Sequence, residues 1–594
     1  MKVARPLTAA SAVAAMVAIS ALLPEFQALR WTLWAIDGLL ALSLTLVWGR
    51  AGIFSFGQAA FFGVGGYAYG IAAINLIDRT GETFSAVVVA VAAATLVAGL
   101  LGYFMFYGNV GDVYVAIITL ATTLVLLTVM SSTAGPQYHL GRAQLGGYNG
   151  ITGIPPLSYG RPGQLATPLT NHQLLALWMV VAALVASGVQ VLSRRPFGRV
   201  VAAMRANEAR TQLLGYDVRR VKLAVFVLGG AIAGLAGAGY AAWGLFLNPV
   251  VFGLQQAALV VIWVLVGGRA SVLGAFVGAA AVQQLSASLG GGRGQATPLI
   301  LGGVLIAVVL LVPSGLVPAL ATTTRRLLPA LRRRPPPPPP AVRPAAAPPG
   351  LHGGAALRTV GVAKRFGGLA AVDGVTLHLP ETGVTCLIGP NGAGKSTLFA
   401  LLTGRERPSA GRILLDGADV TRRAPHQRAR RGIGVKLQVP SIYPDLTTRE
   451  NLWLAAYAEV GDPGLADERA LELLGWLGIA ARGHALAGTL SHGEQQWLEI
   501  GMALGGSPRV VLLDEPTAGM SPEETARTAK LVAELGRHAS VVVVEHDMEF
   551  VRRLDAPVTM LHEGRVFVRG SLAELRADER VLDIYLGRRE HAGA

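Results

Sequence analysis

Residues 389–397 read Gly389-Pro390-Asn391-Gly392-Ala393-Gly394-Lys395-Ser396-Thr397, and this stretch decides the fold of the carboxyl-terminal half. It follows the apolar run 384–388 and precedes the apolar run 398–402, so the pattern predicts a strand, a loop and a helix. The glycines let backbone N–H groups turn toward phosphate oxygens, and the helix N-terminus adds the positive end of its dipole. Lys395 is expected to reach the outer phosphates and the Ser396 hydroxyl to ligate Mg²⁺. The stretch therefore predicts binding of ATP or GTP.

The half of the chain before residue 320 is much more apolar. With 594 residues, 52% of them hydrophobic, and a mean hydropathy of +0.49, the chain is too long for one core and too apolar for a soluble enzyme. Several windows are long enough to cross roughly 30 Å of hydrocarbon as helices. They are 7–24, 31–48, 53–77, 84–107, 113–132, 174–192, 223–246 and 298–317, together with 255–285, which is interrupted by Gly267-Gly268-Arg269 and is interpreted as a hairpin of two short halves. The pattern predicts about ten crossings.

Basic loops predict the orientation of these spans. The loop 193–222 and the exit of the last span, 325–334, are rich in arginine, and such loops stay in the cytoplasm. Both chain ends and the phosphate loop are then cytoplasmic. Eight or nine crossings are the alternatives, although an odd number conflicts with the charges. A cleaved signal peptide is the alternative for the first segment, which follows Lys2 and Arg5.

Charge and cysteine content narrow the function classes further. The net charge is +15 and the pI is near 10.3, but much of the basic excess lies in those two loops. Membrane topology accounts for it, and no nucleic-acid partner is expected. The single cysteine, Cys386, excludes an intrachain disulfide and is expected to be a buried small hydrophobe.

A proline-rich segment separates the two halves. Three arginines, 332–334, precede six prolines, 335–340, and three more prolines follow before residue 350. Such a run forms a semi-rigid polyproline spacer, so we interpret it as a tether that holds two otherwise separate proteins together. A partner domain that recognises proline is the alternative. We predict a transmembrane permease domain at 1–323, a linker at 324–354 and an ATP-binding domain at 355–594.

Two further strands end in groups suited to phosphate chemistry. The apolar run 510–513 leads into Asp514 and Glu515, where Asp514 is expected to hold Mg²⁺ and Glu515 to polarise the water that attacks the γ-phosphate. The β-branched run 541–544 leads into Glu545-His546-Asp547. His546 is expected to contact the γ-phosphate and orient that water, although taken alone it reads as a hydrogen-bonded core histidine.

At this point residues 356–588 resemble the ATP-binding-cassette ATPases. The resemblance is carried by the signature-like Leu490-Ser491-His492-Gly493-Glu494-Gln495, by Ala518-Gly519-Met520-Ser521 at the D-loop, by Gln438 and by Phe366. It implies an α/β P-loop fold, adenine stacking on Phe366, and a role for Gln438 at the Mg²⁺ ion and the attacking water. By its position Ser491 is a helix N-cap; the resemblance adds binding of the γ-phosphate held by another subunit.

The sequence departs from that family at two places. His492 and Glu494 replace the commoner Gly and Gln, and we expect this to be tolerated because the phosphate contacts come from Ser491 and Gly493. Ser521 replaces the usual D-loop Asp, which puts a contact across the dimer in doubt. Because each nucleotide is sandwiched between two such domains, the resemblance implies a second copy of this chain or a related ATPase.

Residues 30–320 resemble the permeases of importers for branched-chain amino acids, urea and short-chain amides. The likeness rests on 42–49, 52–62, Gly65-Gly66-Tyr67 and 198–222. The segment 205–210 resembles the coupling helix that docks on the ATPase, with Arg205, Glu208 and Gly215 at the family's positions. An ordinary basic loop is the alternative interpretation.

The solute must be inferred from the spans. They are poor in charge, and we predict no strong intramembrane charge. The pattern favours a small neutral or zwitterionic solute. Glycine-rich segments at 57–70 and 229–239 favour close helix packing, with a broken helix at the translocation path as the alternative. In the ATPase half, 490–502, 544–551, 438–441 and 585–588 look closest to the urea-importer branch.

We therefore expect a membrane helical permease fused to a cassette ATPase, a multi-pass protein of the bacterial inner membrane. Its expected cofactors are ATP and Mg²⁺. Its expected partners are a second permease and a second ATPase, or a second copy of this chain, together with an extracytoplasmic solute-binding protein and the lipid bilayer. An exporter is the first alternative, and a nucleotide-gated channel or regulatory ATPase is the second.

Overall fold

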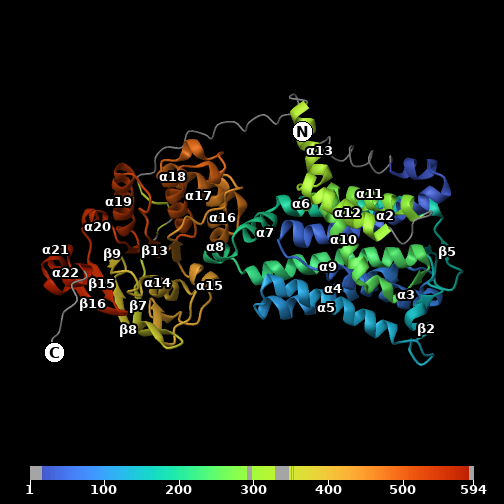
Figure 1. Cartoon of the computed structure of the whole chain (residues 1–594), viewed down its shortest axis with the longest axis horizontal. Helices are drawn as coiled ribbons and strands as arrows, with labels where there is room; N and C mark the ends of the chain where they lie inside the picture. The colour runs from blue at the N-terminus through green and yellow to red at the C-terminus, as the bar shows by residue number, and fades with distance from the viewer. Residues whose placement is uncertain (1–15, 291–296, 328–346, 350, 352, 587–594) are drawn as a thin grey trace. The chain divides into compact units, whose positions relative to one another are not determined.

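The structure is a computed structural model that describes residues 16–290, 297–327, 347–349, 351 and 353–586. The chain forms two compact units, labelled by element in Figure 1. The first, called the membrane unit, comprises residues 1–205 and 219–333; the second, called the ATPase unit, comprises 206–218 and 334–594. Most of the first predicted span, 7–24, and the proline run 335–340 lie outside the described residues.

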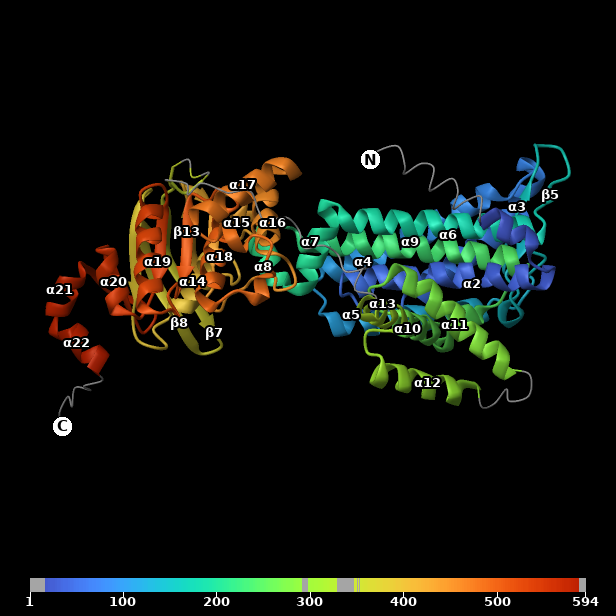
Figure 2. The ribbon, with the colours of Figure 1, turned by 90° about the horizontal axis from the view of Figure 1, so that it is seen from above.

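The membrane unit is built from helices. In chain order they are α2 (Glu25–Leu44), a π-helical segment (Thr45–Arg50), α3 (Gln58–Thr80), α4 (Phe84–Tyr107), α5 (Asp112–Ser131), α6 (Asn171–Arg194), α7 (Pro196–Ala206), α9 (Val218–Gly244), α10 (Leu254–Gly267), α11 (Val272–Gly290), α12 (Thr297–Leu311) and α13 (Leu316–Leu327). Figure 2 shows α2, α6 and α9 running alongside one another. Gly239 of α9 faces the ring of Trp178 in α6, and Gly229 faces Val47, so small residues let these helices approach closely.

Among the described residues, six helices are long and apolar enough to cross a membrane. They are Glu25–Arg50, Gln58–Thr80, Phe84–Tyr107, Asp112–Ser131, Asn171–Arg194 and Val218–Gly244. A seventh candidate is the pair Leu254–Gly267 and Val272–Ser288, bent by 118°. The sequence placed this break at Gly267-Gly268-Arg269. The ten predicted crossings are not confirmed, because α12 has only 15 residues and the first predicted span is largely undescribed.

The span predicted to begin at residue 53 begins later. Between Arg50 and Gln58 the chain is not helical, and Gly52 has a φ of +81°, which favours glycine. Hydropathy does not reveal such a break, because the connecting residues are themselves apolar or small. The result is a discontinuity between α2 and α3, inside the segment that resembles the permeases.

An ionisable side chain, Asp37, lies inside the span Glu25–Arg50, and the sequence analysis did not identify it. Asp37 is 2% exposed and is 12 residues from Glu25 and 13 from Arg50, so it is central in Glu25–Arg50. Its Oδ2 accepts a hydrogen bond of 2.6 Å from Gln283 Nε2 of α11. Buried acids within spans are usually paired in this way.

A loop region between α5 and α6 carries five two-residue strands. They are β1 (His139–Leu140), β2 (Ala143–Gln144), β3 (Ile151–Thr152), β4 (Ser158–Tyr159) and β5 (Thr167–Pro168). β3 pairs with β6 (Phe246–Leu247), which follows α9. The pairing ties this loop region to the end of α9.

The ATPase unit contains two sheets. A four-stranded antiparallel sheet has the order β11 (Ala418–Asp419), β10 (Ala410–Leu415), β7 (Leu357–Phe366) and β8 (Leu369–Leu379). The second has the order β12 (Ile433–Lys436), β13 (Val510–Asp514), β14 (Ser540–Val544), β9 (Gly383–Ile388), β15 (Val558–His562) and β16 (Arg565–Gly570). Its first five strands are parallel, which matches their continuous apolar runs, and β16 is antiparallel.

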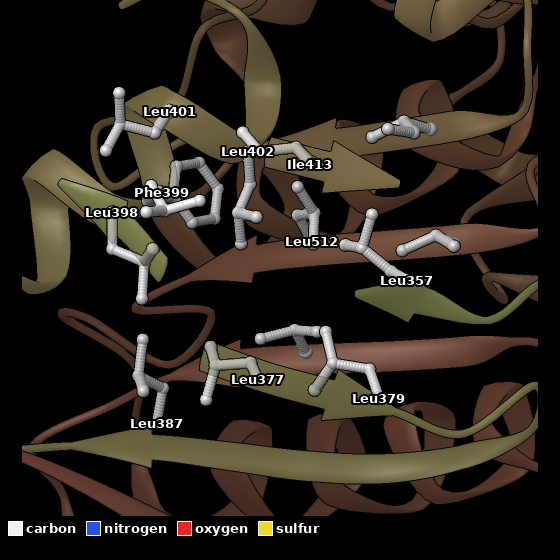
Figure 3. Packing of buried hydrophobic residues seen from close by; sticks show 14 of the residues in the cluster. Leu357, Leu377, Leu379, Leu387, Leu398, Phe399, Leu401, Leu402, Ile413 and Leu512 are labelled. Carbon is white, nitrogen blue, oxygen red and sulfur yellow. The ribbon is translucent and has the colours of Figure 1, made fainter. Parts of the chain in front are cut away.

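Helices fill the remainder of the ATPase unit. They are α8 (Glu208–Leu213), α14 (Lys395–Thr403), α15 (Pro425–Ala429), α16 (Thr448–Val460), α17 (Pro463–Trp476), α18 (His492–Leu504), α19 (Pro522–Gly536), α20 (Met548–Leu554), α21 (Leu572–Ala577) and α22 (Glu579–Leu586). Figure 3 shows Leu398, Phe399 and Leu402 of α14 packing against leucines of both sheets. The core therefore fixes the helix that follows the phosphate loop. Cys386 is buried in β9, and burial raises the pKa of its thiol to about 12.

Candidate functional site: a phosphate loop and the strand ends beside it

The phosphate loop 389–394 connects β9 to α14, which confirms the strand, loop and helix order. Gly394 precedes the helix with a φ of +95°, and a Cβ there would lie 2.4 Å from the Ala371 carbonyl oxygen. Lys395 Nζ donates to the carbonyl oxygens of Gly389 and Pro390 at 2.6 and 3.0 Å. Partial burial lowers the pKa of Lys395, against the opposing charges of Glu515 and Asp514. These two hydrogen bonds hold the Lys395 ammonium against the phosphate loop. The other residues predicted to bind ATP are its neighbours in the chain: Asn391, Gly392, Ala393, Ser396 and Thr397.

Lys395→Ala is expected to weaken nucleotide binding by about 10- to 100-fold, the range that loss of a charge-assisted hydrogen bond to phosphate would give. Titration of the purified chain with a fluorescent ATP analogue measures this affinity. Lys530→Ala, which removes an exposed lysine of α19, is the matched control and should bind as the unaltered chain does. Equal affinity in both variants would contradict the predicted role of Lys395.

Polar groups gather where the parallel strands end. Asp514 ends β13 and pairs in register with Val544, which pairs with Leu387 just before the loop. Carboxyl ends of neighbouring parallel strands meet at one sheet edge, the usual place for ligand sites in such sheets. The edge therefore brings the loop, Asp514 and Glu515, and the residues after β14 together, as the motif order predicted.

Glu515 is held between two predicted partners. Gln438 Nε2, which follows β12, donates to Glu515 Oε2 at 3.0 Å, and His546 Nδ1 lies 3.5 Å from Glu515 Oε1. The His546 side chain is 66% exposed, so it is not the buried core histidine of the alternative interpretation. Glu515 itself has a φ of +44°, an uncommon conformation for this residue type. Such a conformation often marks a functional position.

Asp514 and the buried Lys436 shape the charge of the edge. Burial and, second, the nearby charge of Glu515 raise the pKa of Asp514 to about 6. Lys436 is 0% exposed and donates to the carbonyl oxygens of Asp514 and Glu515 at 2.9 and 2.8 Å. Burial lowers its pKa to about 8. The sequence analysis did not identify Lys436, although a lysine in the otherwise apolar β12 indicates a buried charge with a specific partner.

Glu545 has a structural part in the same edge. Its Oε1 accepts from the Thr517 hydroxyl at 2.6 Å, and its Oε2 accepts from the backbone N–H of His546 at 3.0 Å. It is 1% exposed. Glu545 therefore links the tract after β13 to the turn that presents His546.

The residues predicted to hold Mg²⁺ offer the donors that this ion prefers. Ser396 supplies a hydroxyl at the start of α14, Gln438 an amide oxygen and Asp514 a carboxylate. Mg²⁺ binds oxygen ligands and usually one or two carboxylates together with substrate phosphates. The donor set fits the ion, and Asp514 lies at the sheet edge because it is the last residue of β13.

Phe366 lies at the end of β7 and is 48% exposed. Lys364 Nζ lies 4.8 Å from its ring centroid. An exposed ring can stack on a base, as the resemblance implies.

The signature-like segment forms the start of α18. Ser491 is the N-cap, its side chain accepts from Glu494 N–H, and Glu494 Oε2 accepts from Ser491 N–H at 3.0 Å. This capping box confirms the N-cap prediction. Glu494 also forms an ion pair of 3.1 Å with Arg482, and Gln495 Nε2 donates to the Leu490 carbonyl oxygen. Within the described residues, no hydrogen bond joins this segment to the phosphate loop.

The two departures from the family pattern have local explanations. His492 Nε2 lies 2.9 Å from the Ala518 carbonyl oxygen, so the unusual histidine joins the signature-like segment to the tract 518–521. Ser521 caps α19 in a capping box with Glu524. Gly493 lies in the first turn of α18, whose backbone N–H groups have no carbonyl partner within the helix and favour an anion.

Residues 206–218, called the docking segment, pack within the ATPase unit rather than the membrane unit. Leu213 belongs to the buried apolar cluster of the ATPase unit. Gly215, with a φ of +101°, offers its carbonyl oxygen to Arg430 Nε at 2.7 Å. Arg205 lies just outside the segment and donates to the Gly49 carbonyl oxygen of the membrane unit. Glu208 begins α8.

Sequence reasoning missed the strongest contacts of the docking segment. Arg210 is 0% exposed, donates to the Val435 carbonyl oxygen at 2.6 Å and pairs with Glu499 at 3.5 Å. The Thr211 hydroxyl lies 2.9 Å from Tyr443 Oη, and Tyr216 Oη donates to the Leu454 carbonyl oxygen at 2.7 Å. In sequence Arg210 looked like one more basic residue of a cytoplasmic loop.

Known proteins resemble both halves of the chain. Residues 372–518 match the family described as ABC transporter, and residues 28–312 match the family described as branched-chain amino acid transport system / permease component. BraF of Pseudomonas aeruginosa, a high-affinity branched-chain amino acid transport ATP-binding protein, is 34% identical over 248 residues, 39% of this chain and 97% of BraF. LivG of Salmonella typhimurium, with the same description, is 34% identical over 244 residues, 38% of this chain and 96% of LivG.

An export protein and a solved cassette are also similar. LptB of Acidithiobacillus ferridurans, a lipopolysaccharide export system ATP-binding protein, is 34% identical over 221 residues, 36% of this chain and 90% of LptB. A crystal structure of a nucleotide-free ATP-binding cassette from an ABC transporter is 28% identical, covers 39% of this chain and 98% of its own, and has a TM-score of 0.36. Similarity in the ATPase half alone therefore does not separate import from export.

Proposed function

The chain belongs to the ABC transporters as a permease component fused to an ATP-binding protein, and on that premise we propose that it imports a small neutral or zwitterionic solute. ATP hydrolysis coupled to transport follows from the family. The solute class comprises branched-chain amino acids, urea and short-chain amides. The observation that best supports import is the match of residues 28–312 to the permease component of branched-chain amino acid transport systems, in the same chain as the cassette.

The predicted residues around the phosphate loop have the following roles in this proposal. Glu515 polarises the attacking water, which Gln438 and His546 orient, and Lys395 neutralises the outer phosphates. Ser396, Asp514 and Gln438 would hold Mg²⁺, which would supply neutralisation of the phosphate charge. Phe366 stacks on adenine.

A second cassette completes the site. The signature-like segment has its own contacts away from the phosphate loop, which supports a role at a nucleotide held by another subunit. That subunit is a second copy of this chain or a related ATPase with its own permease, and a solute-binding protein delivers the solute from outside. The spans, ten in the full proposal, lie in the bacterial inner membrane with the ATPase unit cytoplasmic.

The docking segment supports coupling between the halves. It leaves the membrane helices at Arg205 and returns at α9, yet its side chains Arg210 and Leu213 are buried in the ATPase unit. A segment so anchored moves with the ATPase unit. ATP-driven movement of that unit therefore acts on α7 and α9.

Solute-dependent ATP turnover tests the direction of transport. The full assembly, reconstituted in liposomes, should hydrolyse ATP several-fold faster when solute-loaded binding protein is present on the outer side. Binding protein without solute is the control. Export, which LptB exemplifies among the relatives, predicts no response to any external binding protein, and that result would overturn import.

A further inference from the structure

The break between Arg50 and Gln58 surrounds a buried carboxamide. Gln58 begins α3 and is 1% exposed. Within the described part of the chain, neither Gln58 Oε1 nor Gln58 Nε2 has a hydrogen-bond partner. A primary amide offers two donors and an acceptor, and a buried group of this kind is almost always paired. The unpaired donor and acceptor of Gln58 therefore indicate a binding partner outside the described chain.

The backbone of the break does not need the Gln58 side chain. Gly57 N–H donates to the Ser55 hydroxyl at 3.0 Å, and Phe56 N–H donates to the Thr119 hydroxyl at 3.1 Å. These two hydrogen bonds satisfy backbone N–H groups of the turn that leads into α3. A structural explanation of Gln58 as a cap of the broken helix is therefore not supported by its contacts.

The surroundings of Gln58 place it between helices and inside the membrane unit. A Cβ on Gly229 of α9 would lie 2.3 Å from Val47 Cγ2, 3.4 Å from the Ser43 carbonyl oxygen and 3.7 Å from Gln58 Nε2. Ser43 precedes Arg50 by seven residues, roughly 10 Å along a helix. The carboxamide thus lies where α9 meets the π-helical segment, well inside the end of the span.

The same stretch carries two further buried atoms without a hydrogen-bond partner among the described residues, the Thr45 hydroxyl oxygen and Arg50 Nε. Thr45 begins the π-helical segment, is 0% exposed, and its hydroxyl has no partner in the described part of the chain. π-helical turns are rare and occur often at functional sites. Broken helices with unpaired polar groups are also where transporters commonly bind their solutes.

We propose that the Gln58 carboxamide is a solute-contact group of the translocation path, which pairs with a carboxamide or urea group of the solute. Two planar amides can exchange one N–H···O=C bond in each direction, so donor and acceptor are both satisfied. The groups nearest a Cβ placed on Gly229, which are Val47, the Ser43 carbonyl and the Gln58 amide itself, include no acid. An ammonium would find no countercharge among these groups, which favours a neutral amide over an amino acid. This inference rests on the proposed import function and narrows its solute class.

Gln58→Leu separates a solute contact from a structural one. Removing an unpaired buried amide relieves a cost, so the thermal unfolding midpoint of the full chain should stay the same or rise. Uptake of radiolabelled urea or acetamide, in cells where this chain and its natural partners provide the route, should fall at least about 10-fold, the effect of one lost hydrogen-bonding contact. Gln284→Leu is the matched control, since its amide is exposed and bonds to Arg30.

Three results would overturn the assignment. The first is unchanged uptake in Gln58→Leu. The second is a fall of the unfolding midpoint together with uptake, which would show that the amide supports the fold. The third is uptake of leucine by the unaltered chain without uptake of urea or acetamide, which would leave import standing and refute the solute class. Failure of the unaltered chain to import any of the three would instead count against the proposed function itself.

Discussion

Glu515→Gln is expected to lower ATP hydrolysis at least about 100-fold, the contribution typical of a positioned general base. ATP binding should remain, because the substitution keeps the side-chain size and an amide oxygen still accepts the 3.0 Å hydrogen bond from Gln438 Nε2. Solute uptake should stop with hydrolysis. Steady-state phosphate release, binding of a fluorescent ATP analogue and uptake, measured on one preparation, give the three quantities.

The control for this variant is Glu523→Gln. Glu523 lies in the exposed first turn of α19, eight residues along the chain from Glu515. It should hydrolyse ATP at the normal rate. Continued uptake by Glu515→Gln would refute a pump and favour a nucleotide-gated or regulatory membrane ATPase. Loss of ATP binding would indicate a misfolded loop rather than a missing base.

Local chemistry allowed the ATPase fold to be predicted from sequence. The glycine-rich loop, the apolar runs 510–513 and 541–544, and the acids that follow them each need one backbone arrangement, and parallel pairing then brings their ends together. The N-cap at Ser491 was predicted for the same reason. These signals lie within a few residues, so no distant contact was needed to interpret them.

The membrane unit was predicted less well because its signals are not local. Hydropathy averages over a window, so it missed the break between Arg50 and Gln58 and did not distinguish α12, with 15 residues, from a full span. Asp37 was overlooked because one acid scarcely changes the average of an apolar run. Its partner Gln283 lies 246 positions away. The burial of Arg210 was equally unpredictable, because Glu499 is brought to it only by the tertiary fold.

The second prediction with a large expected effect concerns the buried ion pair between Arg210 and Glu499. Both side chains are 0% exposed, and Glu499 Oε1 also accepts from Leu437 N–H at 3.1 Å, next to Gln438. A series of contacts therefore connects Arg210 of the docking segment, through Glu499 and Leu437, to Gln438, which donates a hydrogen bond to Glu515. Arg210→Ala should abolish the response of ATP turnover to solute-loaded binding protein and lower uptake at least about 10-fold, because breaking a buried pair typically costs about 3–5 kcal/mol.

The pH dependence of stability gives this prediction a second readout. Burial raises the pKa of Glu499, and the charges of Arg210 and Lys436 oppose that rise. Without Arg210 the pKa rises further, so Glu499 is protonated in the folded state at pH values where the unfolded chain has lost the proton. A raised folded pKa of an acid gives stability at low pH that is lost as pH rises through it. The unfolding midpoint of Arg210→Ala should therefore fall further below that of the unaltered chain as pH increases.

Adding Glu499→Gln to Arg210→Ala distinguishes an electrostatic role from simple packing. The double variant has no buried carboxylate to leave unpaired, so its midpoint should recover in part and its difference from the unaltered chain should lose the pH dependence. Coupling should stay absent, because the chain of charged contacts from the docking segment to Leu437 is gone. Arg194→Ala, an exposed arginine in the last turn of α6, should behave as the unaltered chain in both assays. A double variant with restored solute-stimulated turnover would show that the pair supports the fold without transmitting movement, since packing alone would then carry the coupling.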